Sequence, residues 1–494
     1  MQLVEADVRN LINEYVCNLL KGYSHSRIAR SKVIHDTVHG THLFHPYEIA
    51  FLDLPIVQRL RRISQTDVTS FVFPSGNHNR FEHTVGTAVV AGLMIDSVFQ
   101  KSGTVLQLDR RDYAYNNCRI AAILHDCGHG PFSHLSEQIF SEQFNNIKIN
   151  NPVFSGASAH EILSYFVATS DPLKEFNSNI IKGLYGIDID LDFVGEMIVG
   201  YIDRIKRKEF GFAVEIINGA FDSDKLDYIL RDAHATGVRM ALDLPRLMYT
   251  LNVIPEELGK ESVLRLAIDI SGVAALEEIV FNKMMLTSTI YHHQKVRAAG
   301  CLLKGIMEMS GRLNSALDYI KLTDDEIYGL NLSDPVYAHQ LHMFKNRNLP
   351  KRAFCFSSRT LEDRTALQNI MSKFNDRDFK NDVIANIALY IRDNLGKDVQ
   401  QNEIWIDSPK NPKFKEATQC LIKTDGSENG YLLLRDVFPT DDWVRAFSEN
   451  KWHGFVYAMP ENCNEVAIAS KIVLEAIFDT RFNPFATRLC KIPD

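Results

Sequence analysis

The sequence predicts a mainly α-helical protein with a small N-terminal β-hairpin and a C-terminal α+β region. Apolar residues recur at helical spacing through most of the first 345 residues. A short segment around Gly40 alternates apolar and polar residues, as hairpin strands do. Beyond residue 345, short β-like runs alternate with helical stretches. We therefore expect an N-terminal helix and loop (1–30), a helical core (31–345) and the α+β region (346–494).

Composition restricts the classes of function. The 494 residues are 45% hydrophobic, which is enough for a large core, and the net charge is −8. With a sequence pI of about 6.1, this balance argues against a constitutive nucleic-acid coat or an anionic-membrane binder. The eight cysteines are scattered without a C-x-x-C motif, and no apolar run reaches the ~18 residues of a membrane helix. We expect a cytoplasmic protein with reduced thiols and with neither a membrane nor a nucleic-acid partner.

The N-terminal part is expected to contain a hairpin between helices. Helices are predicted over Val4–Leu20, Pro46–Ser64 and Asn77–Lys101, and the hairpin over Lys32–His45. The hairpin contains a His35-Asp36 pair. Neighbouring side chains on a strand point to opposite faces, so these two cannot easily share one ion. We expect a structural role for this pair.

The middle of the chain is predicted to be helical. The expected helices cover 160–168, 191–211, 214–237 and 263–309, the last with a polar interruption at 291–300. In the C-terminal region, the runs AFCF, EIWID, CLIK, YLLL and HGFVYAM predict short strands. Helices at 361–374, 379–394 and 465–478 are expected between them.

The segment Arg119–Ser133, RIAAILHDCGHGPFS, organises the chain. It begins as a buried apolar helix that runs directly into His125 and Asp126. Buried polar groups need partners, so this pair is unfavourable unless another group satisfies it. His129 lies four residues after His125, and His134 follows the Gly-Pro break. The cluster predicts a metal site or an acid–base site.

Two further helices supply matching residues. His83 begins one helix, with Arg80 one turn earlier, and Asp224 begins another. Imidazole and carboxylate groups together suit Mn, Fe, Ni, Co or Zn. Such a set leaves about two positions of an octahedral ion open for water and a phosphate oxygen. The absence of a Walker-type glycine loop argues against a P-loop kinase or ATPase. The expected metal ligands are His83, His125, Asp126 and Asp224.

The order H…HD…D of these four residues resembles that of the HD-domain phosphohydrolases. The longer strings KVIHDTVHG, FVFPSGNHNRFEHTVG, LHDCGHGPFSH, SDKLDYILRDAHATG and RNLPKRAF are similar to those of the deoxynucleoside triphosphate triphosphohydrolase branch. That branch includes bacterial dGTP triphosphohydrolases and the vertebrate sterile-alpha-motif and HD-domain dNTPase. The resemblance covers about residues 30–355. It implies an HD-domain helical core and hydrolysis of a dNTP to a deoxynucleoside plus inorganic triphosphate.

The resemblance also implies catalytic roles. One divalent transition metal would bind the four ligands, with Mg²⁺ accompanying the substrate phosphates. His129, His134 and His160 match histidines that line the phosphates. The 5′-alkoxide leaving group has a high pKa and needs a general acid, for which His160, with Glu161 beside it, is the better choice. His134 is expected on the side of the water, and Glu137 replaces an aspartate that orients the histidines in the vertebrate relative.

Substrate contacts follow from the same resemblance. The residues matching phosphate contacts are Arg80, Lys225 and Tyr228, and those matching contacts to the sugar 3′-hydroxyl are Gln65 and Asp232. Lys295 would add positive charge. The chain departs from the family pattern at Met284 (a phosphate-binding arginine), at His292, with Tyr291 next to it (the tyrosine stacked on deoxyribose), and at Thr66 (a leucine). These departures bear on substrate range rather than on the reaction.

The resemblance finally implies regulation across a subunit boundary. In the vertebrate relative, an activator nucleotide binds between subunits. The matching residues here are Asp53, Gln58, Arg61, Arg347 and Lys351. Arginine and lysine can hold phosphates, and a carboxylate can accept hydrogen bonds from a guanine edge; surface ion pairs and a strand entry are the alternative. We expect an activator nucleotide, a homo-oligomer (dimer, tetramer or hexamer) and a regulatory and oligomerisation role for 346–494.

Two other functions remain open, besides single-stranded nucleic-acid binding, to which the acidic balance gives little support. One is a different HD enzyme, such as a phosphodiesterase or nucleotidase. Stringent-response hydrolases carry acidic residues soon after His-Asp, whereas this chain has Cys127-Gly128-His129. The other is a nucleotide-sensing effector whose HD site only binds, which the complete ligand set disfavours. The sequence also leaves open whether an enzyme of this kind would serve dNTP pool control or antiphage dNTP depletion.

Overall fold

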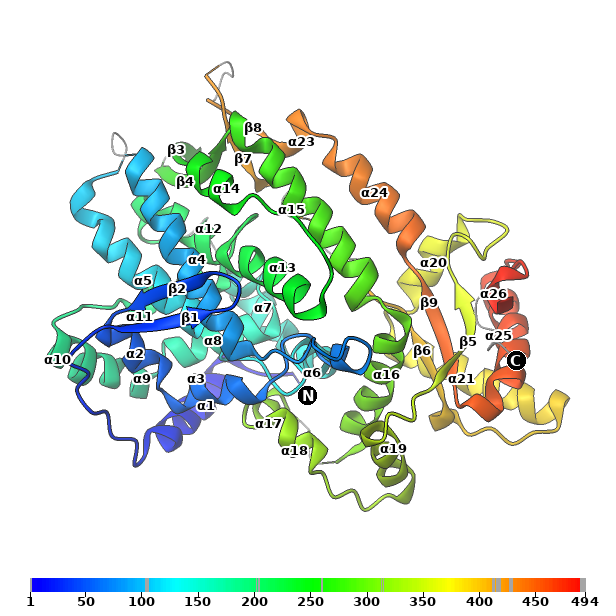
Figure 1. The fold of residues 1–494 in the computed structure, drawn as a ribbon. Helices are drawn as coiled ribbons and strands as arrows, with labels where there is room; N and C mark the ends of the chain where they lie inside the picture. The colour runs from blue at the N-terminus through cyan, green and yellow to red at the C-terminus, as the bar shows by residue number, and fades with distance from the viewer. Residues whose placement is uncertain are drawn as a thin grey trace.

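The computed structural model describes residues 2–488, except 103–105, 201, 203–204, 259–260, 312, 314, 411–413, 415–418 and 426–429. Cys490, counted with the reduced thiols, lies outside the described residues. Helices dominate, with three small sheets. Figure 1 shows the helical core with the N-terminal hairpin on it and the C-terminal region beside it, so the expected mainly α fold is confirmed.

The N-terminal hairpin is present as expected. Strand β1 (Lys32–Asp36) pairs antiparallel with β2 (Gly40–Phe44). Asp36 is buried and accepts a hydrogen bond from Arg231 Nη2 (2.8 Å), whereas the exposed His35 contacts Thr41 Oγ1. The two side chains thus have separate partners, in agreement with a structural role for the pair.

Helix α4 (Arg80–Lys101) is largely buried and packs against α5 (Arg111–Leu124) and α13 (Ser223–Thr236). Small residues on α4 let its neighbours approach closely. At Gly86, an added Cβ would overlap the Asp227 carboxylate and the Arg231 guanidinium of α13. This close approach brings the polar residues of α4 and α13 together.

Shorter helices complete the core. They are α1 (Glu5–Leu20), α2 (Pro46–Leu52), α3 (Pro55–Gln58), α6 (His134–Phe140), α7 (Asn145–Asn150), α8 (Ala159–Ala168), α9 (Asp171–Phe176), α10 (Gly183–Tyr185), α11 (Leu191–Val199), α12 (Gly211–Ile217), α14 (Leu244–Thr250), α17 (Ala316–Ile320), α18 (Asp324–Tyr328) and α19 (Pro335–Lys345). Helix α11 ends well before the expected residue 211. The reason is Gly200, which adopts a left-handed conformation (φ +70°) and caps the helix.

The helix expected over 263–309 is wrong at its start. Strands β3 (Leu251–Leu258) and β4 (Glu261–Asp269) form an antiparallel hairpin there. Helix begins only at α15 (Val273–Leu286), and the π-helical turn η9 (Thr287–Tyr291) links it to α16 (Gln294–Met309). Strand β7 (Leu421–Lys423), far along the chain, pairs with β4. Pairing with β3 and with β7 selects the strand, because so short an apolar run is ambiguous by periodicity.

The C-terminal region is α+β, as expected. Strands β5 (Lys351–Phe356), β9 (Gly454–Ala458) and β6 (Ile404–Asp407) form a sheet in the order β5-β9-β6. The helices of this region are α20 (Ala366–Lys373), α21 (Arg377–Tyr390), α23 (Leu434–Val437), α24 (Thr440–Lys451), α25 (Cys463–Phe478) and α26 (Phe485–Arg488). Strands β7 and β8 (Tyr431–Leu433) instead extend the β3–β4 hairpin. One sheet therefore combines strands from both sides of the boundary expected at residue 345.

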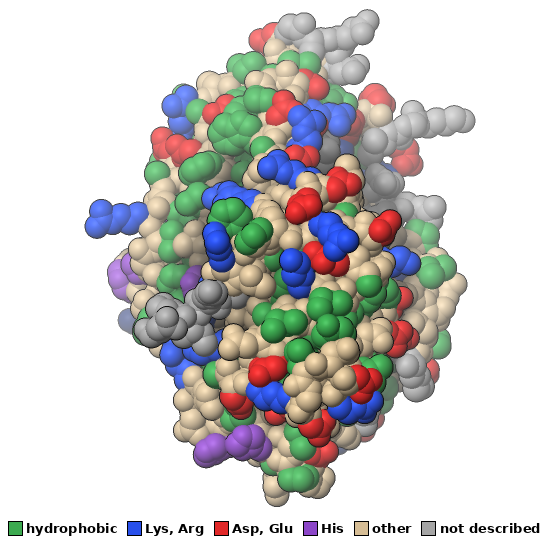
Figure 2. Space-filling model, turned by 90° about the vertical axis from the view of Figure 1, so that its right-hand side faces the viewer, with side chains coloured by type: hydrophobic (Ala, Val, Ile, Leu, Met, Phe, Trp, Pro, Cys, Tyr) green, Lys and Arg blue, Asp and Glu red, His purple; other side chains and the backbone are tan. Residues whose placement is uncertain are grey.

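The surface on the C-terminal side is mixed in character. Figure 2 shows acidic and basic side chains interspersed among apolar ones on this face. Within the described part of the chain, no helix has both the length and the apolar character needed to cross a bilayer.

Candidate active site

The four predicted metal ligands lie together. His83 and Asp224 come from the first turns of α4 and α13, and His125 and Asp126 follow directly after α5. The ligand atoms of His83, His125 and Asp126 lie within 4.8 Å of one another. Asp224 Oδ1 lies 2.9 Å from His83 Nε2, and the Asp224 side chain is 38% exposed, unlike those of the other three. The group is therefore accessible from the side of Asp224.

The histidine orientations fit a metal ion. His125 Nδ1 lies 2.7 Å from the Ala122 carbonyl oxygen, so Nδ1 carries the proton and donates it. His125 Nε2 is then a buried acceptor that has no hydrogen-bond partner. His83 Nδ1 lies 2.7 Å from Asp227 Oδ2, which turns Nε2 toward the carboxylates. Ligating histidines are held in this way by their other nitrogen, so the donor set suits a divalent transition metal.

Asp227, which the sequence patterns do not single out, holds one of the predicted ligands, His83. It accepts hydrogen bonds from His83, from His39 Nε2 (2.7 Å) and from Arg231. Burial opposes its ionisation, but the Arg231 guanidinium and these hydrogen bonds hold the pKa of the Asp227 carboxyl well below its usual range. The sequence feature that indicates Asp227 is its position three residues after Asp224, on the side of the helix that faces α4.

Arg80 contacts the predicted metal ligand Asp126 and also carries an N–H donor that has no acceptor. Its Nη1 donates to Asp126 Oδ2 (2.6 Å) and its Nε to Ser133 Oγ (2.6 Å). Arg80 Nη2 is buried and makes no hydrogen bond. Burial would raise the pKa of Asp126, but Arg80 and His125 hold it below its usual range. The vacant Nη2 is suited to a phosphate oxygen.

A second polar cluster adjoins the first. Glu137 on α6 lies between two histidines, with Oε1 3.0 Å from His160 Nδ1 and Oε2 3.0 Å from His134 Nδ1. The His129 ring stacks on that of His160 with centroids 3.8 Å apart. His129 Nε2 in turn lies 3.4 Å from Asp126 Oδ1. The predicted histidines therefore form one continuous group with the metal ligands.

The two stacked histidines differ in charge. Burial alone would lower the pKa of His160, but the Glu137 carboxylate outweighs it and raises the pKa to about 9. Burial and the positive charge of Arg80 lower the pKa of His129 well below 6.5. At neutral pH His160 is protonated and His129 is neutral.

Glu161 does not join this cluster. Its Oε2 accepts the Ser158 backbone N–H (2.5 Å) in the capping box of α8, and its Oε1 accepts from Asn218 Nδ2 (2.8 Å). The carboxylate thus closes the helix that presents His160 and lies away from the other histidines. Its charge still helps to raise the pKa of His160, and a catalytic role for Glu161 stays a prediction.

The backbone of the loop after Asp126 is strained, and side chains from other segments hold it in place. Phe132 and Ser133 adopt positive φ angles (51° and 50°), which non-glycine residues rarely do. Asp324 Oδ1 accepts the Phe132 N–H (2.7 Å), and Arg59 Nη2 donates to the His129 carbonyl oxygen (2.5 Å). Such strain persists only where surrounding contacts determine the backbone, and it is common at functional sites.

The predicted sugar-binding residues form a third group. Asp232 Oδ2 accepts the Tyr291 hydroxyl (2.5 Å), and Oδ1 accepts His78 Nε2 (2.7 Å). Gln65 is buried, and its Oε1 makes no hydrogen bond. Tyr291 of η9, rather than His292, reaches Asp232. His78 was not singled out in the sequence because it precedes the helix that carries His83.

Two protein-family models match the sequence of this chain. Residues 80–183 match the HD domain, and residues 242–481 match the HD associated region. The chain belongs to the HD-domain family. The HD match includes His83, His125 and Asp126, and the associated region contains η9 and most of the C-terminal region.

Several known proteins are similar to this chain in sequence. The chain is 26% identical over 441 residues to an uncharacterized protein of Methanocaldococcus jannaschii, covering 88% of this chain and 81% of that protein. It is 28% identical over 338 residues to the deoxynucleoside triphosphate triphosphohydrolase SAMHD1 homolog of Dictyostelium discoideum (65% of this chain, 60% of that protein). It is 30% identical over 331 residues to the human deoxynucleoside triphosphate triphosphohydrolase SAMHD1 (60% of this chain, 50% of that protein). The chain thus spans about half of the human protein's length.

The other residues predicted to contact substrate lie in different parts of the structure. They are Lys225, Tyr228, His292 and Lys295. Lys225 Nζ donates to Asp222 Oδ2 (2.6 Å) and to the Gly219 carbonyl oxygen (2.9 Å), next to Asp224. Tyr228 is half-buried on the same helix. His292 lines a pocket whose lining does not include Asp232, and Lys295 is exposed at the start of α16.

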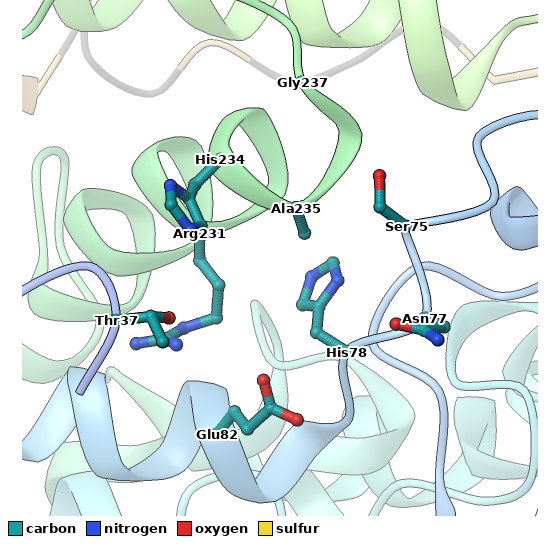
Figure 3. Close-up of a pocket in the computed structure, with 9 residues that line it drawn as sticks. All are labelled: Thr37, Ser75, Asn77, His78, Glu82, Arg231, His234, Ala235 and Gly237. Atoms are coloured by element: carbon teal, nitrogen blue, oxygen red, sulfur yellow. The ribbon is translucent and has the colours of Figure 1, made fainter. Parts of the chain in front are cut away.

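A polar pocket of about 300 Å³ adjoins this HD site. Its lining residues are Thr37, Ser75, Asn77, His78, Glu82, Arg231, His234, Ala235 and Gly237. Figure 3 shows His78 and Glu82 directed toward its centre, with Arg231 at its side. His78 Nδ1 is buried without a hydrogen-bond partner, while Nε2 holds Asp232. His78 therefore connects this pocket to Asp232, a residue predicted to bind the sugar.

The predicted activator residues form two separate groups in the HD-domain chain. Arg61 donates to Gln58 Oε1 (2.8 Å) and lies over the Phe81 ring, and Asp53 nearby is exposed. Arg347 Nε donates to the Phe71 carbonyl oxygen (2.8 Å), and Lys351 begins β5. Among the residues that the structure describes, no hydrogen bond or ion pair joins one group to the other.

Proposed function

We propose that this protein is a metal-dependent phosphohydrolase that converts a dNTP to a deoxynucleoside and inorganic triphosphate. The observation that carries the proposal is the juxtaposition of a buried His–Asp ligand group with a protonated His160 on Glu137. The names of the relatives, deoxynucleoside triphosphate triphosphohydrolases, support the substrate class.

One divalent transition metal (Mn, Fe, Ni, Co or Zn) would be held by His83, His125, Asp126 and Asp224, with Mg²⁺ on the substrate phosphates. When bound, such an ion polarises a phosphate and lowers the pKa of a coordinated or adjacent water. Asp227 and the Ala122 carbonyl orient the two histidines for this role.

The chain's own residues supply the remaining chemistry. Arg80 Nη2 would donate to a phosphate oxygen, because it lacks another acceptor. His160 would give its proton to the departing 5′-oxygen, and Glu137 would stabilise the imidazolium before transfer. His134, whose side chain is 57% exposed, would accept the proton of the attacking water on the open side.

The deoxyribose would bind at the third group. Asp232, held by His78 and Tyr291, would accept the 3′-hydroxyl hydrogen. Gln65 Oε1 is a second buried acceptor without a partner. Together these acceptors would fix the sugar so that its 5′-oxygen faces His160.

The proposal is tested by identifying the products of the reaction. Purified protein is incubated with each dNTP, singly and mixed, in Mn²⁺ or Mg²⁺, and the products are separated by ion exchange. Release of triphosphate supports the proposal. Release of pyrophosphate or phosphate would indicate another HD phosphohydrolase, and binding without turnover would indicate a nucleotide sensor.

We also propose that one nucleotide activates an oligomer of this protein. Arg61 and Lys351 would hold its phosphates from neighbouring subunits. The exposed Lys351 and Asp53 are compatible with an intermolecular pocket. A ligand activates only if it binds the active assembly more tightly than the inactive one.

A further inference from the structure

A second pocket, of about 350 Å³, lies between the η9 turn and strand β9. It is lined by Met285, Ser288, Thr289, His292, Arg359, Lys451, His453 and Phe455. Four of these residues belong to the α15–η9 segment and its exit, and four to the C-terminal region. Four of the eight are basic residues and none is acidic. None belongs to the metal group or to the His160–Glu137 pair.

The cations around this pocket lack counter-charges. Arg359 and Lys451 are exposed, and within the described part of the chain neither forms an ion pair with a carboxylate. Arg352 lies beside them, with its guanidinium 5.7 Å from the centroid of the Phe455 ring. This accumulation of positive charge occurs in a chain whose net charge is −8.

One carboxylate close to the pocket, Asp407, is already engaged. Asp407, which interacts with His292, is held by Arg297 through two hydrogen bonds of 2.9 and 2.6 Å. Burial, followed by the charge of Arg297, lowers the pKa of His292 to about 4. Burial and the charges of Arg359 and other nearby cations likewise lower the pKa of His453. Both rings are therefore neutral near pH 7, and the charge excess is left to arginine and lysine.

We propose that this pocket binds an oligophosphate anion. Arginine and lysine are the usual partners of phosphate groups, and the Thr289 hydroxyl can donate to a remaining oxygen. The Ser288 hydroxyl donates to the Met285 carbonyl oxygen at 3.2 Å and would have to leave that acceptor to join them. The anion would bridge the HD core and the C-terminal region. It would also contact η9, whose Tyr291 donates to Asp232. Binding at this pocket does not depend on the proposed hydrolysis.

The test is direct binding to the full chain without metal. Isothermal titration calorimetry in EDTA is run with inorganic triphosphate and, separately, with dATP. The double variant Arg359→Ala/Lys451→Glu should weaken binding by at least about tenfold, because two charge-assisted contacts are lost. The control Arg392→Ala/Lys410→Glu changes the same charge at two exposed positions of the same region and should bind like the parent protein.

The two ligands distinguish the source of the phosphates. Equal affinity for both would assign the pocket to any oligophosphate, and preference for dATP would assign it to a nucleotide; both support the proposal. Absence of saturable binding overturns it. Binding that survives in the double variant but is lost in Arg80→Ala also overturns it. The same holds if a single-stranded oligonucleotide competes for the pocket more strongly than triphosphate or dATP does. Matching circular dichroism spectra and melting temperatures verify that all variants fold.

Discussion

Glu137 Oε1 lies 3.0 Å from His160 Nδ1, and this contact keeps the imidazole protonated at neutral pH. The same oxygen accepts the backbone N–H groups of Ala159 (2.9 Å) and His160 (3.2 Å) at the start of α8. The carboxylate thus fixes both the position and the charge of the histidine. In the proposed reaction, only the protonated form of His160 can donate to the leaving group, so activity should fall as pH rises through about 9.

Glu137→Gln should move this alkaline limb to lower pH. Removing the carboxylate lets the pKa of His160 fall, by roughly one to three units. The activity of the variant should therefore be lost at a lower pH than that of the parent, as measured by kcat between pH 6 and 10. Glu161→Gln is the matched control, and it should shift the limb less because Glu161 contributes less to the charge of His160. If the alkaline limb of the kcat profile does not shift in Glu137→Gln, a group other than His160 causes that limb.

His160→Ala should lower kcat by about 10²–10⁴ with the metal retained. The substitution removes the proton donor but none of the proposed ligands. Metal content by inductively coupled plasma mass spectrometry, together with kcat, checks both parts. A small loss of kcat with an unchanged pH profile would transfer the role to His134 or His129.

Asp126→Ala should remove both metal and turnover. Asp227→Asn should be milder, because Asp227 orients His83 without being a proposed ligand; a loss of about 10–100-fold in metal affinity is expected. Metal titration of the purified variants measures the difference. Stoichiometric metal and full activity in Asp126→Ala would contradict the ligand assignment.

His78→Phe should raise KM for a dNTP more than it lowers kcat. The variant leaves Asp232 without the donor at Oδ1, so the carboxylate that would receive the 3′-hydroxyl loses its fixed orientation. A change of about tenfold corresponds to one hydrogen bond to a charged group. His234→Ala, which lines the same pocket, is the control. Equal effects of the two substitutions would point to the pocket rather than to Asp232.

Arg61→Ala/Lys351→Ala should abolish activation by a second dNTP while leaving basal metal binding intact. In the parent protein, one dNTP should accelerate hydrolysis of another, and the oligomer should grow or tighten as it binds. Mixed-substrate kinetics and sedimentation velocity measure the two effects. Hyperbolic kinetics for every dNTP and an oligomer indifferent to nucleotide would exclude this form of regulation.

The sequence by itself determined the helical class, the N-terminal hairpin and which residues come together as candidate metal ligands. These features depend on local patterns. Apolar periodicity defines the helices, and His125-Asp126 at the end of a buried helix is conspicuous because buried polar groups need partners. The cluster that contains His83, His125 and Asp126 follows from two such short segments.

Only the tertiary structure decided which residues support that group. Periodicity predicts helix where strand β4 forms, and β4 pairs both with its neighbour β3 and with β7, far along the chain. Asp227 faces His83 only because Gly86 lets α13 approach α4. Tyr291, rather than His292, reaches Asp232 because η9 is π-helical, which rotates successive side chains away from their α-helical directions. Each outcome depends on contacts between distant segments, which local periodicity does not specify.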